Sequence, residues 1–305
     1  MASLSEISGR MNSIRDTMKI TKAMYMISSN KLRKAKKDLE ANDPYRITLE
    51  NEIRRILRHT PEFQHIYFDN REKDMQEEVK KCGFIVVTAD KGMAGAYNHN
   101  VVKCAENLMS QEKDYKLYVI GEMGRQYFAA AGYQIAESFH YTAQNPTLYR
   151  AKIIAEYMVD QYLNEELDEI VIIYTSMVNG ISDEVSVEKL LPLLQSKFAP
   201  KLPPEIAMLS YQEEFKLIPS AETVIESLVP NYLTGLIYSY LVESFCCEQN
   251  ERMMAMDAAN RNAEEMLKEL SITYNRVRQG AITQEITEVV GGAAALKRKK
   301  KAKAK

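Results

Sequence analysis

The sequence predicts an α/β protein in which an antiparallel coiled coil of the N- and C-terminal helices is joined to a Rossmann-like α/β domain. Both ends of the 305-residue chain place apolar residues at alternating steps of three and four, the pattern of a coiled-coil helix. Between the ends, apolar runs of strand length alternate with amphipathic stretches, which indicates parallel strands with helical crossovers. Hydrophobic residues make up 46% of the chain, enough to fill such a core.

The N-terminal helix is predicted from a line of apolar and small residues that continues for about five heptads. This first apolar line consists of Leu4, Ile7, Met11, Ile14, Met18, Thr21, Tyr25, Ser28, Leu32, Ala35 and Leu39. Ile20, Met24 and Ile27 form a second apolar stripe beside it, set among lysines. One line serves one partner helix, so the second stripe indicates a further contact. Pro44 interrupts the pattern, a helical period resumes beyond it, and Pro61 ends it.

The middle of the chain is expected to form parallel strands separated by helices. The expected strands are residues 82–90, 115–121, 133–140 and 168–178. Two later segments, residues 184–193 and 207–220, are expected to add extended, hairpin-like structure. The segment "TADKGMAGAYN" follows the first strand and resembles a phosphate-binding turn only superficially, because it lacks both GxxxxGK[ST] and GxGxxG. We interpret it as a tight strand-to-helix turn with close backbone packing.

The C-terminal helix is predicted because neither Gly nor Pro occurs between Gly235 and Gly280. Its apolar line comprises Tyr238, Val242, Phe245, Gln249, Arg252, Met256, Ala259, Ala263, Met266, Leu270, Thr273 and Val277. Gln249 and Arg252 are polar, and a buried polar pair destabilises a fold unless its hydrogen bonds are satisfied. Either the two helices diverge there and both side chains are solvated, or both are buried with partners. One helix enters the middle region and the other leaves it, so we expect them to pack antiparallel.

These patterns divide the chain into four parts. We expect an N-terminal coiled-coil helix over residues 1–60, an α/β domain over 61–230, a C-terminal coiled-coil helix over 231–296 and a basic tail over 297–305. The tail, "KRKKKAKAK", is open to three interpretations: a disordered segment, an extension of the helix or an artificial addition. We expect it to be disordered, because its like charges repel one another.

Several classes of protein and site are excluded by composition and motif. The formal net charge of -2 is unlike that of a nucleic-acid-binding polycation. The four cysteines form no CxxC, and with the four histidines they form no cluster of metal-ligand spacing. The longest apolar run is cut by Glu243 and is too short to span a bilayer. We find no nucleophile elbow. We also find no paired acid and base, since the two adjacent carboxylates Asp168 and Glu169 are typical of the polar start of a strand. We therefore predict no catalytic residue, no cofactor and no metal.

Three segments resemble the γ subunit of F-type ATP synthase, in its bacterial form. The N-terminal "MASLSEISGRMNSIRDTMKITKAMYMISSNKLRKA" is similar to that family's N-terminus. The turn "TADKGMAGAYN" resembles the family's "TSDRGLCGGYN"-like loop. The C-terminal "ERMMAMDAANRNAEEMLKELSITYNRVRQGAITQEITEVVGGAAAL" is similar to its closing block, in which "ITQEITEVVGGAAA" fits the family signature. The resemblance covers both ends and most of the middle, in order.

The resemblance implies a central-stalk rotor that couples ion translocation through the membrane sector to ATP synthesis and hydrolysis on the β subunits. The implied partners are the α and β subunits of the catalytic ring, the ε subunit and the membrane c-ring, with the α/β domain as the foot. It implies that the second apolar stripe and its lysines face the ring, where an acidic loop on β suits Lys19, Lys22 and Lys31. The residues that it places against the ring are Lys19, Lys22, Met24, Ile27, Arg252, Arg278, Gln279, Thr283, Glu285 and Glu288.

The resemblance also implies a non-catalytic, peripheral protein at the cytoplasmic face of the cell membrane, associated with the membrane only through its partners. Two rival classes are a nucleotide-dependent enzyme on the α/β domain and a coiled-coil adaptor whose basic tail binds nucleic acid or anionic lipid. The missing phosphate motifs argue against the first, and the net charge argues against a nucleic-acid partner.

Overall fold

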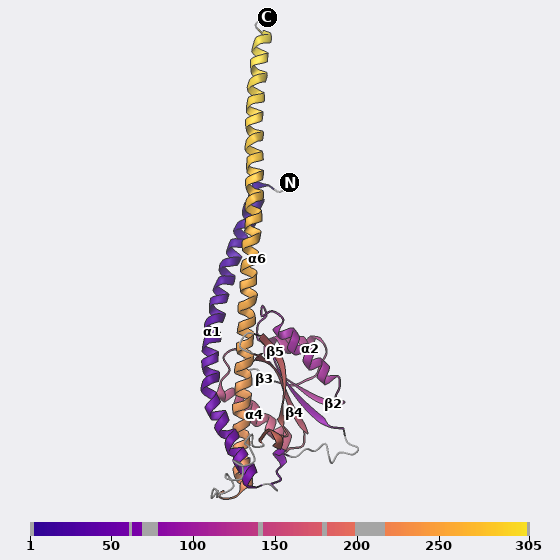
Figure 1. The fold of residues 1–305 in the computed structure, drawn as a ribbon. Coiled ribbons are helices and arrows are strands. Elements are labelled where there is room, and N and C mark those ends of the chain that lie inside the picture. The colour runs from indigo at the N-terminus through magenta and orange to yellow at the C-terminus, as the bar shows by residue number, and fades with distance from the viewer. Residues whose placement is uncertain are drawn as a thin grey trace. The chain divides into compact units, whose positions relative to one another are not determined.

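A computed structural model of the chain describes residues 3–60, 63–68, 79–139, 143–178, 182–198 and 217–303. The chain divides into two compact units. The terminal unit consists of residues 1–27 and 253–305, and the sheet unit consists of residues 28–252. Two long helices, α1 (Leu4–His59) and α6 (Ala221–Lys303), contribute to both units, and the chain between them forms the sheet (Figure 1).

The sheet unit has a five-stranded mixed sheet of order β3-β2-β1-β4-β5. The first four strands are parallel, and β5 pairs with β4 antiparallel. Its strands are β1 (Lys81–Val87), β2 (Asp114–Ile120), β3 (Ile135–Phe139), β4 (Glu169–Val178) and β5 (Ser182–Leu191). Its shorter helices are η1 (Ile66–Phe68), α2 (Tyr97–Met109), α3 (Glu122–Ala130), α4 (Leu148–Leu163) and η3 (Gln195–Phe198). Strand and helix alternate as predicted, so the expected α/β domain is confirmed.

Each face of the sheet is covered by its own hydrophobic core. Alternate residues of β1 point to opposite faces, so Ile85 lies in one core while Phe84 and Val86 lie in the other. The core that contains Ile85 is closed by α4, the end of α1 and the first part of α6. The second core is closed by α2 and α3. Because β1 is buried on both faces, its sequence is continuously apolar rather than alternating.

Within the sheet unit, α1 and α6 pack antiparallel. Ala35 of α1 clusters with Val242, Phe245 and Cys246, whereas Asn42, two turns further along α1, contacts earlier residues of α6. The coiled-coil packing expected for the terminal helices is therefore confirmed.

Two prolines lie inside continuous helices: Pro44, at which we expected an interruption of the N-terminal helix, and Pro230, the last residue of the expected α/β domain. Pro44 is within α1 and Pro230 is within α6. The α6 helix starts at Ala221, ten residues before the expected position 231. An interior proline destabilises a helix by about 3 kcal/mol or more. Burial offsets this cost in α6, because Ile225 and Val229 precede the proline in the core and are fully buried.

At its other end, α6 is helical through Lys303, although we expected residues 297–305 to be disordered. The high helix propensity of Ala, Lys and Arg accounts for this difference. Residues 207–216 of the expected hairpin addition, and His140 at the end of an expected strand, lie outside the described residues.

In the terminal unit, the first apolar line differs by one position from the expected one. Ile7 is buried and Met18 and Thr21 are partly buried, as expected. Met24, which we assigned to the second stripe, is also partly buried, whereas Tyr25 is 37% exposed. The same slip occurs on α6, where the residues after Met266 and Thr273, namely Leu267 and Tyr274, are the partly buried ones. An alternation of three- and four-residue steps fits either of two neighbouring residues. The pattern therefore does not decide which of the two neighbours faces the partner helix.

Candidate functional site

The first candidate site is the crevice at the carboxyl ends of β1 and β4. In an open α/β sheet, ligands bind where the strand order reverses, and here that point lies between these two strands. The α6 helix contacts both strand ends. Glu243 Oε1 accepts a hydrogen bond from the backbone N–H of Met177 at 3.1 Å, and fully buried Cys247 packs with Ala89 and Ala94 beyond β1. The position at which related sheets bind nucleotides is therefore filled by this chain's own helix.

The turn after β1 is held by its own side chains rather than left open for a phosphate. Asn98 Oδ1 accepts a hydrogen bond from the backbone N–H of Ala89 at 2.9 Å. Asp90 accepts from the backbone N–H groups of Glu122 and Gln144 at 3.2 and 3.0 Å. Gly95 has a φ of +53°, and a Cβ atom there would lie 2.3 Å from a carboxylate oxygen on α6. The interpretation of this segment as a tight strand-to-helix turn is confirmed.

A buried ion pair within α6 lies next to this turn, and its arginine also hydrogen-bonds to the turn. Arg252 Nη1 donates to Glu248 Oε1 at 2.6 Å, and Nη2 donates to the backbone carbonyl oxygens of Lys91 and Gly92 at 3.0 and 3.1 Å. The side chains of Arg252 and Glu248 are only 10% and 1% exposed. Burial raises the pKa of Glu248, and the Arg252 guanidinium opposes that rise.

The same cluster includes Gln249, whose Nε2 donates to Glu248 Oε1 at 3.2 Å. Of the two alternatives for Gln249 and Arg252, the structure shows burial with partners. Sequence analysis placed Arg252 against a ring partner, and that assignment stays a prediction, since the guanidinium here contacts its own chain. The signal in the sequence was a polar pair within an otherwise apolar line.

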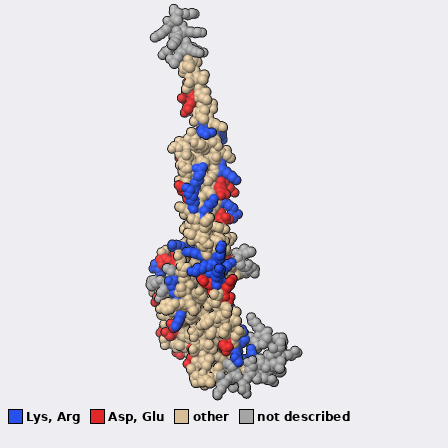
Figure 2. All heavy atoms as spheres, turned by 90° about the vertical axis from the view of Figure 1, so that its left-hand side faces the viewer, with Lys and Arg blue, Asp and Glu red and all other residues tan. Residues whose placement is uncertain are grey.

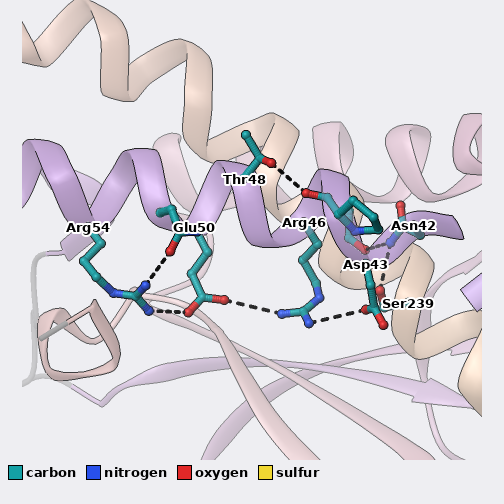
Figure 3. Close-up of polar contacts among 10 residues, drawn as sticks. Asn42, Asp43, Arg46, Thr48, Glu50, Arg54 and Ser239 are labelled. Atoms are coloured by element: carbon teal, nitrogen blue, oxygen red, sulfur yellow. Dashed lines mark hydrogen bonds and ion pairs between the residues drawn. The ribbon is translucent and has the colours of Figure 1, made fainter. Parts of the chain in front are cut away.

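A second polar group joins α1 to α6 lower in the sheet unit (Figure 3). Asn42 Nδ2 donates to Gly235 O at 3.1 Å and to Ser239 Oγ at 2.9 Å. Next to it on α1, Arg46 lies 3.4 Å from carboxylate oxygens of both Asp43 and Glu50, and a further arginine continues this chain of ion pairs. Buried hydrogen bonds of this kind fix the register of two helices, because a slip would leave the amide unsatisfied.

The two carboxylates at the start of β4 have structural partners. Asp168 Oδ2 accepts a hydrogen bond from the backbone N–H of Lys81 at 2.9 Å. Glu169 is paired with Lys80 at 2.7 Å and with Lys189 at 2.5 Å. These contacts agree with the predicted role as the polar start of a strand.

The terminal unit presents most of the other predicted contact residues. Ile20 and Ile27 of the second stripe are 62% and 55% exposed. Lys19 Nζ is 2.8 Å from an Asp16 oxygen within α1, and Lys22 Nζ is 3.6 Å from Glu264 Oε1 on α6. The remaining predicted residues are all exposed on α6: Arg278, Gln279, Thr283, Glu285 and Glu288.

Sequence analysis missed an apolar surface on the same part of α6. Every described side chain from residue 282 to 294 is exposed, because α6 continues past the beginning of α1 (Figure 1). The large apolar side chains among them, here called the tip stripe, are Ile282, Ile286, Val289 and Val290, at 47%, 59%, 72% and 63% exposure. Their spacing of four and three is the signal that could have identified them.

No group of His, Cys, Asp or Glu within the described residues is arranged to hold a metal ion. Likewise, no helix in the described part of the chain has the length and apolar content needed to cross a bilayer.

Comparison with known proteins identifies similar chains. A family model described as ATP synthase matches residues 3–296. The ATP synthase gamma chain of Ruminiclostridium cellulolyticum is 42% identical over 294 residues, covering 96% of this chain and 98% of that protein. The gamma chain of Acetivibrio thermocellus is 43% identical over 298 residues, covering 97% and 100%.

Solved structures show a similar fold. A chain of the Tetrahymena thermophila mitochondrial ATP synthase central stalk and c-ring has a TM-score of 0.57 at 22% identity, covering 79% of this chain and 99% of that one. A chain of the Euglena gracilis mitochondrial ATP synthase has a TM-score of 0.54 at 15% identity, covering 90% and 95%.

Proposed function

The chain belongs to the gamma-chain family of ATP synthases, and from this premise we propose how its two units act in the complex. As a γ subunit it is the central-stalk rotor of an F-type ATP synthase. We propose that it is non-catalytic and that it couples ion translocation to ATP synthesis and hydrolysis on the β subunits by turning inside the ring of α and β subunits.

The tip stripe carries this proposal. Four large apolar side chains on one stretch of α6 are exposed in the isolated chain. Exposed apolar clusters of this kind mark surfaces that another protein covers. The α and β subunits of the ring cover them when α6 lies along the ring axis, and Arg278, Gln279, Thr283, Glu285 and Glu288 then supply polar contacts around the apolar ones.

The second apolar stripe serves as a lateral contact. Ile20 and Ile27 present apolar surface to the ring, and Lys19 and Lys22 present positive charge for an acidic loop on β. Met24 contributes from the border of the α1–α6 contact, where it is partly buried. Arg252 reaches the ring only if its guanidinium leaves Glu248 and the backbone carbonyl oxygens of Lys91 and Gly92. We therefore assign it first to the link between α6 and the sheet unit.

The sheet unit is the foot that meets the ε subunit and the membrane c-ring. We propose that the chain lies at the cytoplasmic face of the cell membrane as a peripheral protein, and that its partners alone connect it to the membrane. A nucleotide-dependent activity of the sheet unit is disfavoured, because α6 fills the crevice between the ends of β1 and β4. We place the ATP chemistry on the β subunits.

The mechanism is a population shift by differential contact. The two helices present different side chains on different sides, so each β subunit meets a different surface as the rotor turns. To move one β subunit from 1:99 to 99:1 between two conformations, the contact must differ by about 5.5 kcal/mol. A few buried apolar side chains at about 1.5–3 kcal/mol each are sufficient for this difference.

The experiment is co-expression of this chain with α and β subunits, followed by purification and ATPase assays with and without the chain. The proposal expects a stable complex and a clear rise in ATP turnover when the chain is present, with no turnover by the chain alone. Failure to co-purify with the ring, or turnover by the isolated chain, would contradict it.

A further inference from the structure

A buried amide joins α1 to α6 within the sheet unit. Asn42 Nδ2 donates hydrogen bonds to Gly235 O and Ser239 Oγ, at 3.1 and 2.9 Å, and we call these three residues the Asn42 link (Figure 3). Asn42 and Ser239 are only 7% and 6% exposed, so water does not compete for these hydrogen bonds. The two acceptors are four residues apart on α6, and the amide therefore contacts two successive turns of that helix.

The α1 helix is weakened two residues beyond Asn42. Pro44 has no backbone N–H, so the helical hydrogen bond to the carbonyl oxygen of Glu40 is missing. Thr48 Oγ1 donates to Pro44 O at 2.7 Å, and side-chain contacts of this kind tend to bend helices (Figure 3). A helix that lacks a backbone hydrogen bond bends and twists more easily, so α1 alone transmits torque poorly at this level.

The α6 helix is weakened at the same level. Gly235 lies inside α6, and Pro230 precedes it by five residues. An interior glycine destabilises a helix relative to alanine, because it gains more conformational freedom when the helix unwinds. A Cβ atom at Gly235 would lie 3.5 Å from a ring carbon of Tyr45 and 3.9 Å from Arg46 Cβ. The lack of a side chain therefore brings α1 close to the α6 backbone where the Asn42 amide reaches it.

The apolar contacts nearby resist separation of the two helices better than they resist sliding. Ala35 of α1 packs with Val242, Phe245 and Cys246 of α6. Apolar burial has no preferred direction, and packed elements can shift past one another by a whole helical turn, about 5.4 Å. The hydrogen bonds of the Asn42 link are directional, and such a shift would leave the amide buried without its acceptors.

The ion pairs beside the Asn42 link do not replace it. Arg46 pairs with Asp43 and Glu50, and Glu50 pairs with Arg54, so every one of these contacts joins two residues of α1. Their side chains are partly exposed, and Figure 2, which views the molecule from the α1 side, shows basic and acidic side chains together on this surface. Such pairs stiffen α1 beyond Pro44 but do not hold it to α6.

We propose that Asn42 is a positioning residue of the rotor, because the Asn42 link holds α1 and α6 in register under torque where both helices are weak. This inference rests on the proposed function, in which torque passes between the ring and the sheet unit along α1 and α6. Both helices continue from the sheet unit into the terminal unit. Without the link, the helices shift past one another under load, and part of the torque is lost before it reaches the sheet unit.

The test compares bead rotation at low and high load. Complexes of this chain with α and β subunits are fixed by the ring, and each carries a small or a large bead on the sheet unit. Asn42→Leu removes both donated hydrogen bonds and keeps a side chain of similar size. This variant should hydrolyse ATP and turn small beads at the speed of the unsubstituted complex. With large beads, whose viscous drag is greater, it should lose torque and rotate irregularly.

Two further variants locate the effect. Ser239→Ala removes one of the two acceptors, so its loss of torque should lie between those of Asn42→Leu and the unsubstituted complex. Asn51→Leu is the matched control, because Asn51 is an exposed amide on the same helix whose printed neighbour, Arg54, also belongs to α1. Asn51→Leu should turn large beads normally.

Hydrogen exchange on the isolated full-length chain gives a readout that does not depend on activity. Loss of two hydrogen bonds of ordinary strength changes the population of a shifted register by roughly thirtyfold. The backbone amides of Ile47 and Thr48 should therefore exchange faster by about tenfold or more in Asn42→Leu, and at the normal rate in Asn51→Leu. Circular dichroism melts confirm that each variant is folded, and Ser239→Ala carries the test if Asn42→Leu is unfolded.

The outcomes separate this inference from the proposed function. An unsubstituted complex that turns no bead contradicts the proposed function, and this inference with it. Normal rotation of the unsubstituted complex, with equal torque from Asn42→Leu on large beads, overturns this inference alone. A loss of speed that is the same for small and large beads, with reduced ATP turnover, would identify a general structural defect and would also overturn it.

Discussion

Removal of the Arg252 guanidinium should destabilise the sheet unit strongly. The variant Arg252→Met leaves Glu248, 1% exposed, as a buried carboxylate without its cation. It also removes the donor of two hydrogen bonds to the backbone carbonyl oxygens of Lys91 and Gly92. Breaking a buried pair by removing one partner typically costs about 3–5 kcal/mol, and we expect the free energy of unfolding to fall by that amount at pH 8.

A matched control exists on the same helix. Arg261 and Asp257 form an ion pair of the same spacing and the same 2.6 Å distance, but their side chains are 72% and 49% exposed. Arg261→Met should therefore lower the free energy of unfolding by no more than about 1 kcal/mol. Urea denaturation followed by circular dichroism measures both variants.

The pH dependence gives an independent test of the cause. Burial raises the pKa of Glu248, and loss of Arg252 removes the charge that opposes this rise. An acid whose pKa is raised in the folded state contributes stability below its unfolded pKa and loses that contribution as pH rises through the folded value. The deficit of Arg252→Met should therefore shrink as pH is lowered toward 5. Equal losses for Arg252→Met and Arg261→Met, or a deficit that does not change with pH, would refute the reasoning.

Three further changes should have distinct effects. Gly121→Ala should lower the free energy of unfolding by about 2 kcal/mol or more, because Gly121 has a φ of +98° and its new Cβ would lie 2.2 Å from Thr88 O. Gly132→Ala should lower it less, because Gly132 has a φ of +84° but open space around it. Thermal melts would compare the two variants. Ile286→Ser should leave the melting temperature of the chain unchanged, because this side chain is 59% exposed. The same variant should lower the ATP turnover of the assembled complex. Unchanged turnover would contradict the role of Ile286 in the tip stripe. Deletion of residues 297–305 should leave assembly and ATP turnover intact, since mutual repulsion opposes specific docking of this basic segment, and a severe loss of either would show that it makes a specific contact.

The sequence predicted the elements of the sheet well, because burial on both faces imposes a direct signal. Strand β1 had to be continuously apolar, and the turn after it had to contain Gly95 for close packing against α6. The errors came where tertiary packing overrides local preference. Pro230 is a local signal for a helix start, but Ile225 and Val229 are buried ahead of it, so the helix continues through it.

The candidate site was less predictable than the fold. The pattern showed that Arg252 was out of place in an apolar line, but its carbonyl partners lie 160 and 161 residues away along the chain. Only the folded arrangement brings them together. The exchange of Met24 and Tyr25 has a different origin, since a repeat of three and four fits either residue and only the shape of α6 decides between them.

The central claim is that this chain turns inside the ring, and single-molecule rotation tests it most directly. The ring of α and β subunits is fixed to a surface, and a bead is attached to an exposed cysteine introduced at Lys103 on α2, a position outside the contacts discussed above. The account predicts rotation in one direction when ATP is added, in three steps per turn. Steady ATP hydrolysis by the assembled complex with a bead that shows only unbiased fluctuation would contradict it.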